Sequence, residues 1–296
     1  MAPFTRRQFL LASTASAFAA TAYQFRYVLS TCLYGQGRIE QILPEVRKTG
    51  ASALDIWPKK WGAQREQIDE IGHDRFTALL NEHRVSVGVL SRYDLGPFGL
   101  GPELPVGRKF GAKAIICGAR GPKGLSGDAL KSAVRDFAEQ MKPHVAAAAE
   151  AGLTIGIENH GASLTEHPDS LKWLIEFTPP TIGIALAPYH LEQNPALIAS
   201  LIRDLGNRIV LFYAWQRGKG LGKDVSPQQV LEQLPGRGPM DFVPIVAALR
   251  QIQYAGWVAI FLHTVPGGLP IRESTAAVTA EIRRSRDYLH SSLKRS

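Results

Sequence analysis

Short apolar runs alternate with amphipathic stretches along the chain from about residue 27 onward. Apolar runs rich in branched side chains are typical of buried strands, and they occupy residues 27–33, 53–57, 85–91, 112–118, 153–159, 182–187, 209–214 and 257–263. The stretches between them repeat apolar residues at helical spacing, over residues 39–48, 66–83, 128–151, 168–177, 195–205, 241–253 and 273–293. Strands that alternate with helices predict a parallel sheet, either open or closed into a barrel.

The pattern within the strands favours the closed barrel. In one run, Leu153, Ile155 and Ile157 share one face, whereas Gly156 and Glu158 share the other. Branched residues on the helix-facing side and small or polar residues on the inner side suit a crowded barrel interior. Eight strands also favour the barrel, with no GxGxxG after the first of them. Seven are followed by a helical stretch, and the third by a Gly- and Pro-rich connection over residues 96–110, expected to be a loop with at most one or two helical turns. The sequence therefore predicts an α/β protein with a single (β/α)8 TIM barrel domain over residues 23–296.

The first 22 residues have the order of segments expected of an export signal. Arg6 and Arg7 precede an apolar stretch, and small residues at positions 20–22 then offer a cleavage site. This order is typical of bacterial twin-arginine signal peptides, which an export receptor recognises. We therefore expect residues 1–22 to be a signal peptide and the protein to be exported, to the periplasm or beyond. An ordinary N-terminal helix is the alternative, and the apolar stretch is too short for a stable membrane anchor.

Composition narrows the function classes. Of the 296 residues 45% are apolar and 20% are charged, so the chain can bury a large core and is not a disordered protein. Two cysteines, Cys32 and Cys117, are too few for a disulfide framework. The net charge of +8 favours anionic partners, with a basic but ordinary surface as the alternative. The sequence contains no P-loop, so nucleotide binding has no support.

Several segments, in order along the chain, resemble the xylose isomerase-like barrels, which include sugar phosphate isomerases and epimerases and endonuclease IV. Residues 156–160, Gly-Ile-Glu-Asn-His, resemble the fifth strand of that family, and residues 50–57 resemble the second, with Asp55 in place of a common Glu. Residues 110–115 resemble the fourth strand and residues 254–260 the turn into the eighth. The resemblance covers about residues 25–290 and implies a reaction that isomerises or epimerises a sugar.

The resemblance also implies a divalent-metal site, and this sequence departs from it. Family members hold the ion with a Glu, an Asp, a His and a Glu on strands five to eight, and the two glutamates move a proton across an enediolate. These positions read Glu158, Ala187, Tyr213 and Phe261 here, so three usual ligands and the second base are missing. Alanine and phenylalanine cannot ligate a hard cation.

Other polar residues are expected at the same end of the barrel, where barrel enzymes hold their active sites. His190 follows the sixth strand, Gln216 follows the seventh, and His263 continues the inner face of the eighth. We expect a shifted metal site in which Glu158, His190, His263 and Gln216 hold Mn²⁺ or Zn²⁺. A hydrogen-bonded role without a metal is the alternative for each histidine.

Three residues at this end are candidate catalytic acids and bases. They are Glu158 and His160 at the end of the fifth strand and Tyr213 on the seventh. A glutamate buried in a barrel is costly without a partner, which favours a functional role for Glu158 over a purely structural one. Tyr213 has packing in the barrel interior as its alternative role.

Loops and aromatic rings at this end are candidate substrate contacts. Arg120 and Lys219 lie in Gly-rich loops after strands four and seven, where the backbone can approach an anion closely. Trp57, Tyr189 and Trp215 offer flat faces to a sugar ring. The expected partner is a small-molecule sugar. It carries a phosphate or a carboxylate if the basic loops bind it, and is neutral if those loops are only solvated.

These observations favour an exported enzyme like the sugar isomerases and epimerases, which uses a metal-assisted proton transfer. A non-catalytic carbohydrate-binding barrel that has lost its metal is the alternative. A DNA-repair nuclease is disfavoured, because the three-metal cluster of endonuclease IV needs more His and acidic ligands than this chain offers, and an exported protein does not meet DNA. We therefore expect no nucleic-acid partner.

Overall fold

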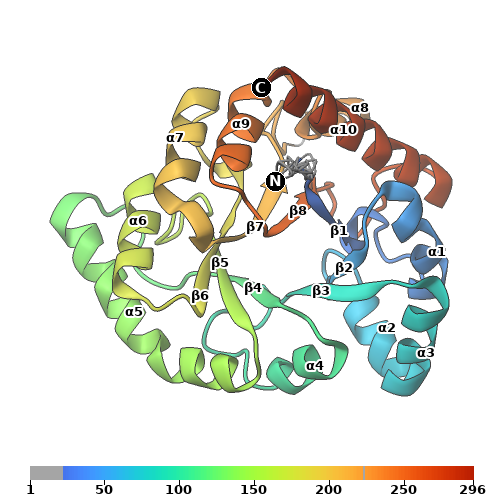
Figure 1. Ribbon diagram of the computed structural model, residues 1–296, viewed down its shortest axis with the longest axis horizontal. Helices are drawn as coiled ribbons and strands as arrows, with labels where there is room; N and C mark the ends of the chain where they lie inside the picture. Colours follow the sequence, from blue (N-terminus) through green and yellow to red (C-terminus); the bar gives the residue numbers. More distant parts are fainter. Residues whose placement is uncertain (1–22, 223) are drawn as a thin grey trace, which may run out of the picture.

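The computed structural model describes residues 23–222 and 224–296, so the predicted signal peptide lies outside the described residues. Eight parallel strands form a closed barrel in which each strand pairs with its neighbours in sequence and β8 pairs with β1. The helices surround the strands (Figure 1). The predicted (β/α)8 TIM barrel is therefore confirmed.

The strands are short and largely buried. Each of them overlaps the apolar run that predicts it. Their bounds are β1 Arg26–Ser30, β2 Ala53–Ile56, β3 Ser86–Ser91, β4 Ala114–Gly118, β5 Thr154–Glu158, β6 Ile182–Leu186, β7 Ile209–Ala214 and β8 Trp257–Ile260. Several runs extend past the strand because their last residues are buried in the loops at the carboxyl end of the barrel, as Phe261 is after β8.

The helices follow the predicted amphipathic stretches with three differences. Their bounds are α1 Ile39–Thr49, α2 Gln64–Ile71, α3 His73–His83, α4 Glu103–Phe110, α5 Gly127–Glu150, α6 Pro168–Phe177, α7 Pro195–Leu205, α8 Pro227–Val230, α9 Val243–Gln251 and α10 Thr275–Arg295. The helix predicted over residues 66–83 is divided at Gly72, whose φ of 84° is incompatible with a continuous helix. The eight-residue helix α4 lies in residues 96–110, where the sequence predicts a loop with at most one or two helical turns, and the short helix α8 was not predicted. None of the described helices is both long and apolar enough to cross a membrane.

Glycines in the middle of two strands allow the barrel interior to be filled from neighbouring strands. A Cβ atom at Gly183 on β6 would overlap a methyl group of Val210 and lie 3.0 Å from the Arg208 carbonyl oxygen. Gly156, its partner on β5, is similarly blocked by Ile116. The small inner residues that favour a barrel in the sequence therefore have a direct steric cause.

Replacing Gly183 by Ala is expected to lower the free energy of unfolding by about 1–3 kcal/mol, because the added methyl group overpacks the interior against backbone as well as side chain. Gly101 is a matched control, since a Cβ there meets nothing within 4 Å and its φ is negative or extended. Urea denaturation of both variants measures the difference. Equal stability of Gly183→Ala and Gly101→Ala would contradict this account of the interior.

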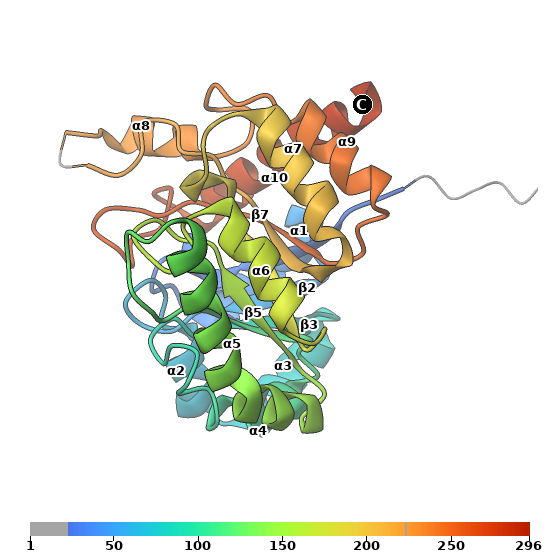
Figure 2. The same ribbon diagram turned by 90° about the vertical axis from the view of Figure 1, so that its left-hand side faces the viewer.

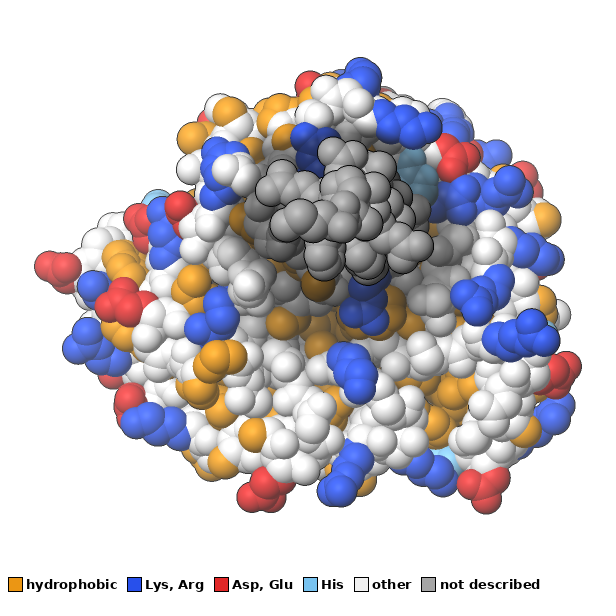
Figure 3. All heavy atoms as spheres, viewed as in Figure 1, with side chains coloured by type: hydrophobic (Ala, Val, Ile, Leu, Met, Phe, Trp, Pro, Cys, Tyr) orange, Lys and Arg blue, Asp and Glu red, His pale blue; other side chains and the backbone are white. Residues whose placement is uncertain are grey.

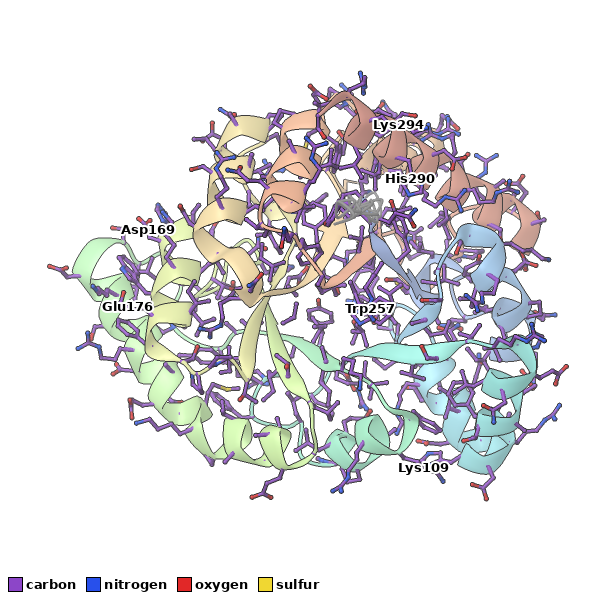
Figure 4. The ribbon with its side chains drawn as sticks, viewed as in Figure 1. Lys109, Asp169, Glu176, Trp257, His290 and Lys294 are labelled. Carbon is purple, nitrogen blue, oxygen red and sulfur yellow. The ribbon has the colours of Figure 1, made fainter. Side chains whose placement is uncertain are left out.

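The two ends of the barrel have different structures. The chain enters β1 at one end, and the segment with α8 projects from the other (Figure 2). At the entry end Trp257 lies near the middle of the ring of strands (Figure 4), with the Arg26 guanidinium 4.3 Å from the centroid of its indole ring. Lys and Arg side chains are spread across this entry end (Figure 3). The excess positive charge is therefore not confined to the carboxyl end, where the candidate site lies.

Candidate active site at the carboxyl end of the barrel

Glu158 is the last residue of β5 and faces the barrel interior. Its side chain is buried, and the whole residue is only 5% exposed. Burial raises the pKa of this carboxyl group to about 8, and the neighbouring Tyr93 hydroxyl lowers it by a smaller amount. At neutral pH Glu158 therefore holds a proton in most molecules and can exchange it near physiological pH.

Two tyrosines lie beside this carboxyl group. The hydroxyl oxygens of Tyr93, after β3, and Tyr213, on β7, are 3.1 Å apart and share a hydrogen bond. Burial raises the pKa of both phenols well above the usual value, and the negative charge of Glu158 acts in the same direction. Both are therefore neutral hydroxyl groups that can donate a hydrogen bond. Tyr213 is a catalytic candidate from the sequence, whereas Tyr93 is expected there only as one of the aromatic residues near this end of the barrel.

Asp55 on β2 is a second buried carboxyl group inside the barrel. Its oxygens accept hydrogen bonds from Ser30 Oγ at 2.7 Å, Trp57 Nε1 at 2.6 Å and Ser91 Oγ at 2.8 Å. Burial raises its pKa to about 6, and the three hydrogen bonds limit this shift. Asp55 is consequently ionised at neutral pH. An aspartate inside the apolar run 53–57 is a sequence feature that could have identified it as a site residue.

Aromatic side chains fill the barrel around these groups. Trp57 stacks on Tyr93 and on Phe261, with ring centroids 5.3 Å apart in both pairs. Tyr189 stacks on Trp215 with centroids 4.0 Å apart. Trp57 and Trp215 are almost completely buried. The predicted sugar contacts Trp57, Tyr189 and Trp215 therefore lie at the correct end of the barrel, but their faces are largely occupied by other rings of the protein.

The predicted histidines gather at the rim of the same end. The rings of His160 and His190 are 4.0 Å apart, and those of His190 and His263 lie 5.2 and 5.1 Å from the ring of Trp215. Burial lowers the pKa of both His190 and His263 to about 3, so both are neutral. His190 Nε2 is buried without a hydrogen-bond partner. His160 is exposed, and its Nδ1 contacts the Gly161 carbonyl oxygen.

Two buried glutamines hold the rim in place. The Gln216 side chain accepts a hydrogen bond from the Met240 amide at 2.8 Å and donates one to the Leu234 carbonyl at 2.9 Å. Gln233, which was not predicted, accepts from Trp215 Nε1 at 2.8 Å and from the His263 amide at 3.2 Å. Both hydrogen bonds of the Gln216 side chain are made with backbone groups of the loop between β7 and α9. The side chain therefore stabilises this loop.

The residues present do not fit the predicted Mn²⁺ or Zn²⁺ ion. Among the described residues no group of three or more His, Cys, Asp and Glu side chains is arranged to hold a metal ion. His190 and His263 each pack against Trp215. Gln216, the fourth predicted ligand, is bound to the backbone. The shifted metal site proposed from the sequence is thus not supported by the donor set.

The predicted basic residues are exposed in the loops. Arg120, after β4, lies beside Gly96 of the loop after β3, and Lys219, after β7, is also exposed. Arg217, in the same loop as Lys219, donates hydrogen bonds to the carbonyl oxygens of Tyr189 and Leu191 and so joins the loops after β6 and β7. Arg120 and Lys219 are therefore accessible to solvent in loops at the carboxyl end of the barrel.

A buried ion network supports the loop that carries Tyr93. The Glu103 carboxylate of α4 pairs with Arg65 of α2, at 2.9 Å from Nε, and with Arg92, which immediately precedes Tyr93. Arg65 and Arg92 also pair with Asp69 and Asp94, at 2.6 and 2.8 Å. Charges that lie close together in a buried place must be paired, so this network fixes α2, α4 and the loop after β3 as one unit.

Comparison with known proteins identifies the class of this barrel. A profile of the xylose isomerase-like TIM barrel family matches residues 43–287. The chain belongs to this family. Among curated protein sequences no significant match was found.

Solved structures agree on the fold at low sequence identity. The IOLI protein with a binding zinc atom superposes with a TM-score of 0.69 at 12% identity, over 92% of this chain and 99% of that chain. An L-ribulose 3-epimerase superposes with a TM-score of 0.69 at 15% identity, over 92% of this chain and 95% of that chain. A probable 3-DHS dehydratase, AsbF from Bacillus anthracis, superposes with a TM-score of 0.67 at 14% identity, over 88% of this chain and 98% of that chain. At these identities the comparison establishes the architecture.

Proposed function

We propose that this chain is an enzyme that transfers a proton on a sugar or a sugar derivative, in an isomerisation, an epimerisation or a related reaction beside a carbonyl group. The observation that carries the proposal is the buried Glu158 carboxyl group at the carboxyl end of the barrel, with a pKa of about 8. A group with this pKa can give or take a proton near neutral pH, as general acid–base catalysis requires. The epimerases and the dehydratase of the same fold support this reaction type.

Glu158 and Tyr213 are the proposed groups for proton transfer. The neutral hydroxyl of Tyr213 is a donor for an oxygen on which negative charge develops. The exposed His160 at the rim is the second proposed acid or base, and Arg120 and Lys219 are the proposed contacts of an anionic substituent. No step requires a metal ion, because the donor set does not fit one. The zinc atom of the structurally similar IOLI protein is therefore not transferred to this chain.

Export remains part of the proposal and is supported by the twin arginines and the small residues at positions 20–22. The proposed compartment is the periplasm. The proposed ligand is a small-molecule sugar, either with a phosphate or carboxylate group or without one.

Solvent-hydrogen exchange tests the proposed reaction. The purified protein is incubated in D₂O with L-ribulose, D-tagatose and D-psicose, the sugars that appear in the names of structurally similar proteins. Deuterium is expected at the carbon beside the carbonyl of at least one sugar, and NMR detects it. The rate is expected to be unchanged by prior treatment with EDTA, because Glu158 acts without a metal. Loss of exchange after EDTA, restored by Zn²⁺ or Mn²⁺, would contradict the metal-independent form of the proposal.

A non-catalytic carbohydrate-binding barrel is the second candidate. The observation that favours it is the packing of Tyr213, Trp215 and Phe261 in the barrel interior, where each is almost fully buried. In the same experiment this candidate predicts that a sugar shifts the NMR signals of the protein while no deuterium enters the sugar. Exchange above the rate of the protein-free control excludes it.

A further inference from the structure

The large apolar side chains that are exposed lie at one end of the barrel. Among the described residues there are four of them, Leu197 at 52%, Leu221 at 38%, Val265 at 55% and Leu269 at 49%. Leu197 is in the first turn of α7, which follows β6, whereas Leu221 follows β7 and the other two follow β8. All four therefore belong to segments that begin at the carboxyl end of the barrel, and the entry end exposes no described side chain of this kind.

Three of these side chains belong to loops whose charged residues are all basic. The basic–apolar surface consists of three loops at this end, residues 57–63 after β2, 215–222 after β7 and 264–270 after β8. These loops contain no Asp or Glu, and their exposed apolar side chains are Leu221, Val265 and Leu269. Their cations are all exposed, and they are Lys59, Lys60, Arg217 and Lys219. Leu197 lies outside this surface, in a pocket that Glu166 and Glu192 also line.

The loops of the basic–apolar surface are held together by direct contacts. A Cβ atom at Gly267 would lie only 2.6 Å from the Trp61 ring, so the loop after β8 packs closely on the loop after β2. Gln233 joins the ends of β7 and β8, because it accepts from Trp215 Nε1 at 2.8 Å and from the His263 amide at 3.2 Å. The three loops therefore form one side of the carboxyl end, from which the segment with α8 also extends (Figure 2).

The spacing of the apolar side chains fits a bilayer better than the surface of a second protein. A protein interface has a contiguous apolar core. In the basic–apolar surface, glycines flank Leu221, and residues 266–268, Pro-Gly-Gly, separate Val265 from Leu269. Apolar side chains that stand apart can each insert at the boundary between lipid headgroups and acyl chains, while the neighbouring Lys and Arg remain at the level of the phosphates.

The charge of this surface indicates which bilayer it fits. Loops with cations and no acid are attracted to the negative potential of anionic phospholipids, and each Lys or Arg near such a surface strengthens binding by about fivefold. Trp61 is partly exposed, with the Lys60 ammonium 5.1 Å from the centroid of its ring, and tryptophan is a residue typical of membrane–water interfaces. We propose that the basic–apolar surface docks this protein, peripherally and reversibly, on a bilayer that contains anionic phospholipid. The inference goes beyond the proposed function and does not depend on it.

Sedimentation of the full chain with lipid vesicles tests the contribution of charge. The wild-type protein is expected to bind vesicles of phosphatidylcholine with about one third phosphatidylglycerol, and to bind pure phosphatidylcholine at least about tenfold more weakly. Lys59→Gln combined with Lys60→Gln is expected to lower the partition coefficient on the anionic vesicles by about tenfold or more. The matched control is Lys113→Gln combined with Lys294→Gln, which removes two exposed cations at the entry end and is expected to change the coefficient by less than about twofold.

The same measurement tests the contribution of the apolar side chains. Val265→Ser combined with Leu269→Ser is expected to lower the partition coefficient by about tenfold, because two side chains no longer enter the apolar boundary. Leu197→Ser is the matched control. Leu197 is exposed to a similar degree at the same end but lies outside the basic–apolar surface, so a change of less than about twofold is expected. Residues 1–22 are identical in all these proteins, so any affinity of their own for lipid cancels in the comparison.

Three results would overturn the inference. Wild-type binding that is no stronger on anionic vesicles than on phosphatidylcholine would exclude lipid and leave a protein as the partner of this surface. Equal losses in the two double lysine variants would assign the attraction to the net charge of the whole chain. Unchanged binding after the double substitution of Val265 and Leu269 would remove the role of the apolar side chains. Circular dichroism checks that each variant is folded.

Discussion

Replacing Glu158 by Gln is expected to reduce the rate of deuterium exchange into the sugar by about 100-fold or more, the usual contribution of a general acid or base. The amide has nearly the shape of the protonated carboxyl group, but it cannot release a proton. The fold is therefore expected to be retained, and circular dichroism checks this. Retention of the wild-type rate in a folded Glu158→Gln protein would refute the assigned role.

The pH dependence of stability provides an independent control on Glu158. Its pKa is about 8 in the folded protein, against a usual value of 4.5 that applies to the unfolded chain. Between pH 4.5 and 8 the unfolded chain has released this proton and the folded protein still holds it, so the folded state loses stability as the pH rises through this window. The Glu158→Gln variant lacks this pH-dependent contribution to stability, because its amide does not titrate. The stability of the variant relative to wild type should therefore increase from pH 5 to pH 8, as urea denaturation at several pH values measures.

Replacing Glu103 by Gln is expected to lower the free energy of unfolding by about 3 kcal/mol, because it leaves two buried arginines without their shared carboxylate. The residue is 4% exposed, and Arg65 and Arg92 both pair with it. Each arginine keeps one partly exposed partner, Asp69 or Asp94, which places the expected effect at the lower end of the range for broken buried pairs. Urea denaturation measures this loss.

Glu139 on α5 supplies the matched control for Glu103. It pairs with Lys142 on the surface, where both side chains are more than half exposed, so Glu139→Gln is expected to change stability by less than about 1 kcal/mol. Similar losses in the two variants would show that the buried network does not stabilise the loop before Tyr93. A large loss in Glu103→Gln alone would support the assignment of α2, α4 and this loop to one unit.

The fold was predictable because its signals are local. Apolar runs and amphipathic stretches alternate over the whole chain, and the inner positions of β5 and β6 are small wherever a neighbouring strand fills the interior. The division of one predicted helix at Gly72 was missed because a single glycine does not by itself end a helical pattern. The short helix α8 lies in a segment with little periodicity and escaped prediction for that reason.

The candidate site was only partly predictable, because its contacts join residues distant in sequence. The alternation in β5 correctly places Glu158 at the inner carboxyl end, but its neighbour Tyr93 follows β3 and meets it only across the closed barrel. The second buried carboxyl group, Asp55, comes from β2. The metal site was proposed from the position of residues along strands. Position does not determine where a ring points, and His190 and His263 pack against Trp215 instead of forming a metal-binding group.

Gln233 gives the rim of the barrel a mechanical property of its own. One side chain binds the Trp215 indole and both the amide and the carbonyl of His263, and its backbone carbonyl accepts from the Gln216 amide. The segment between β7 and α9 is thus fastened to the ends of two strands at once. The part of this segment around Gln233 cannot move outward without breaking these bonds to Trp215 and His263. Movement of Gln233 is therefore coupled to the ends of β7 and β8.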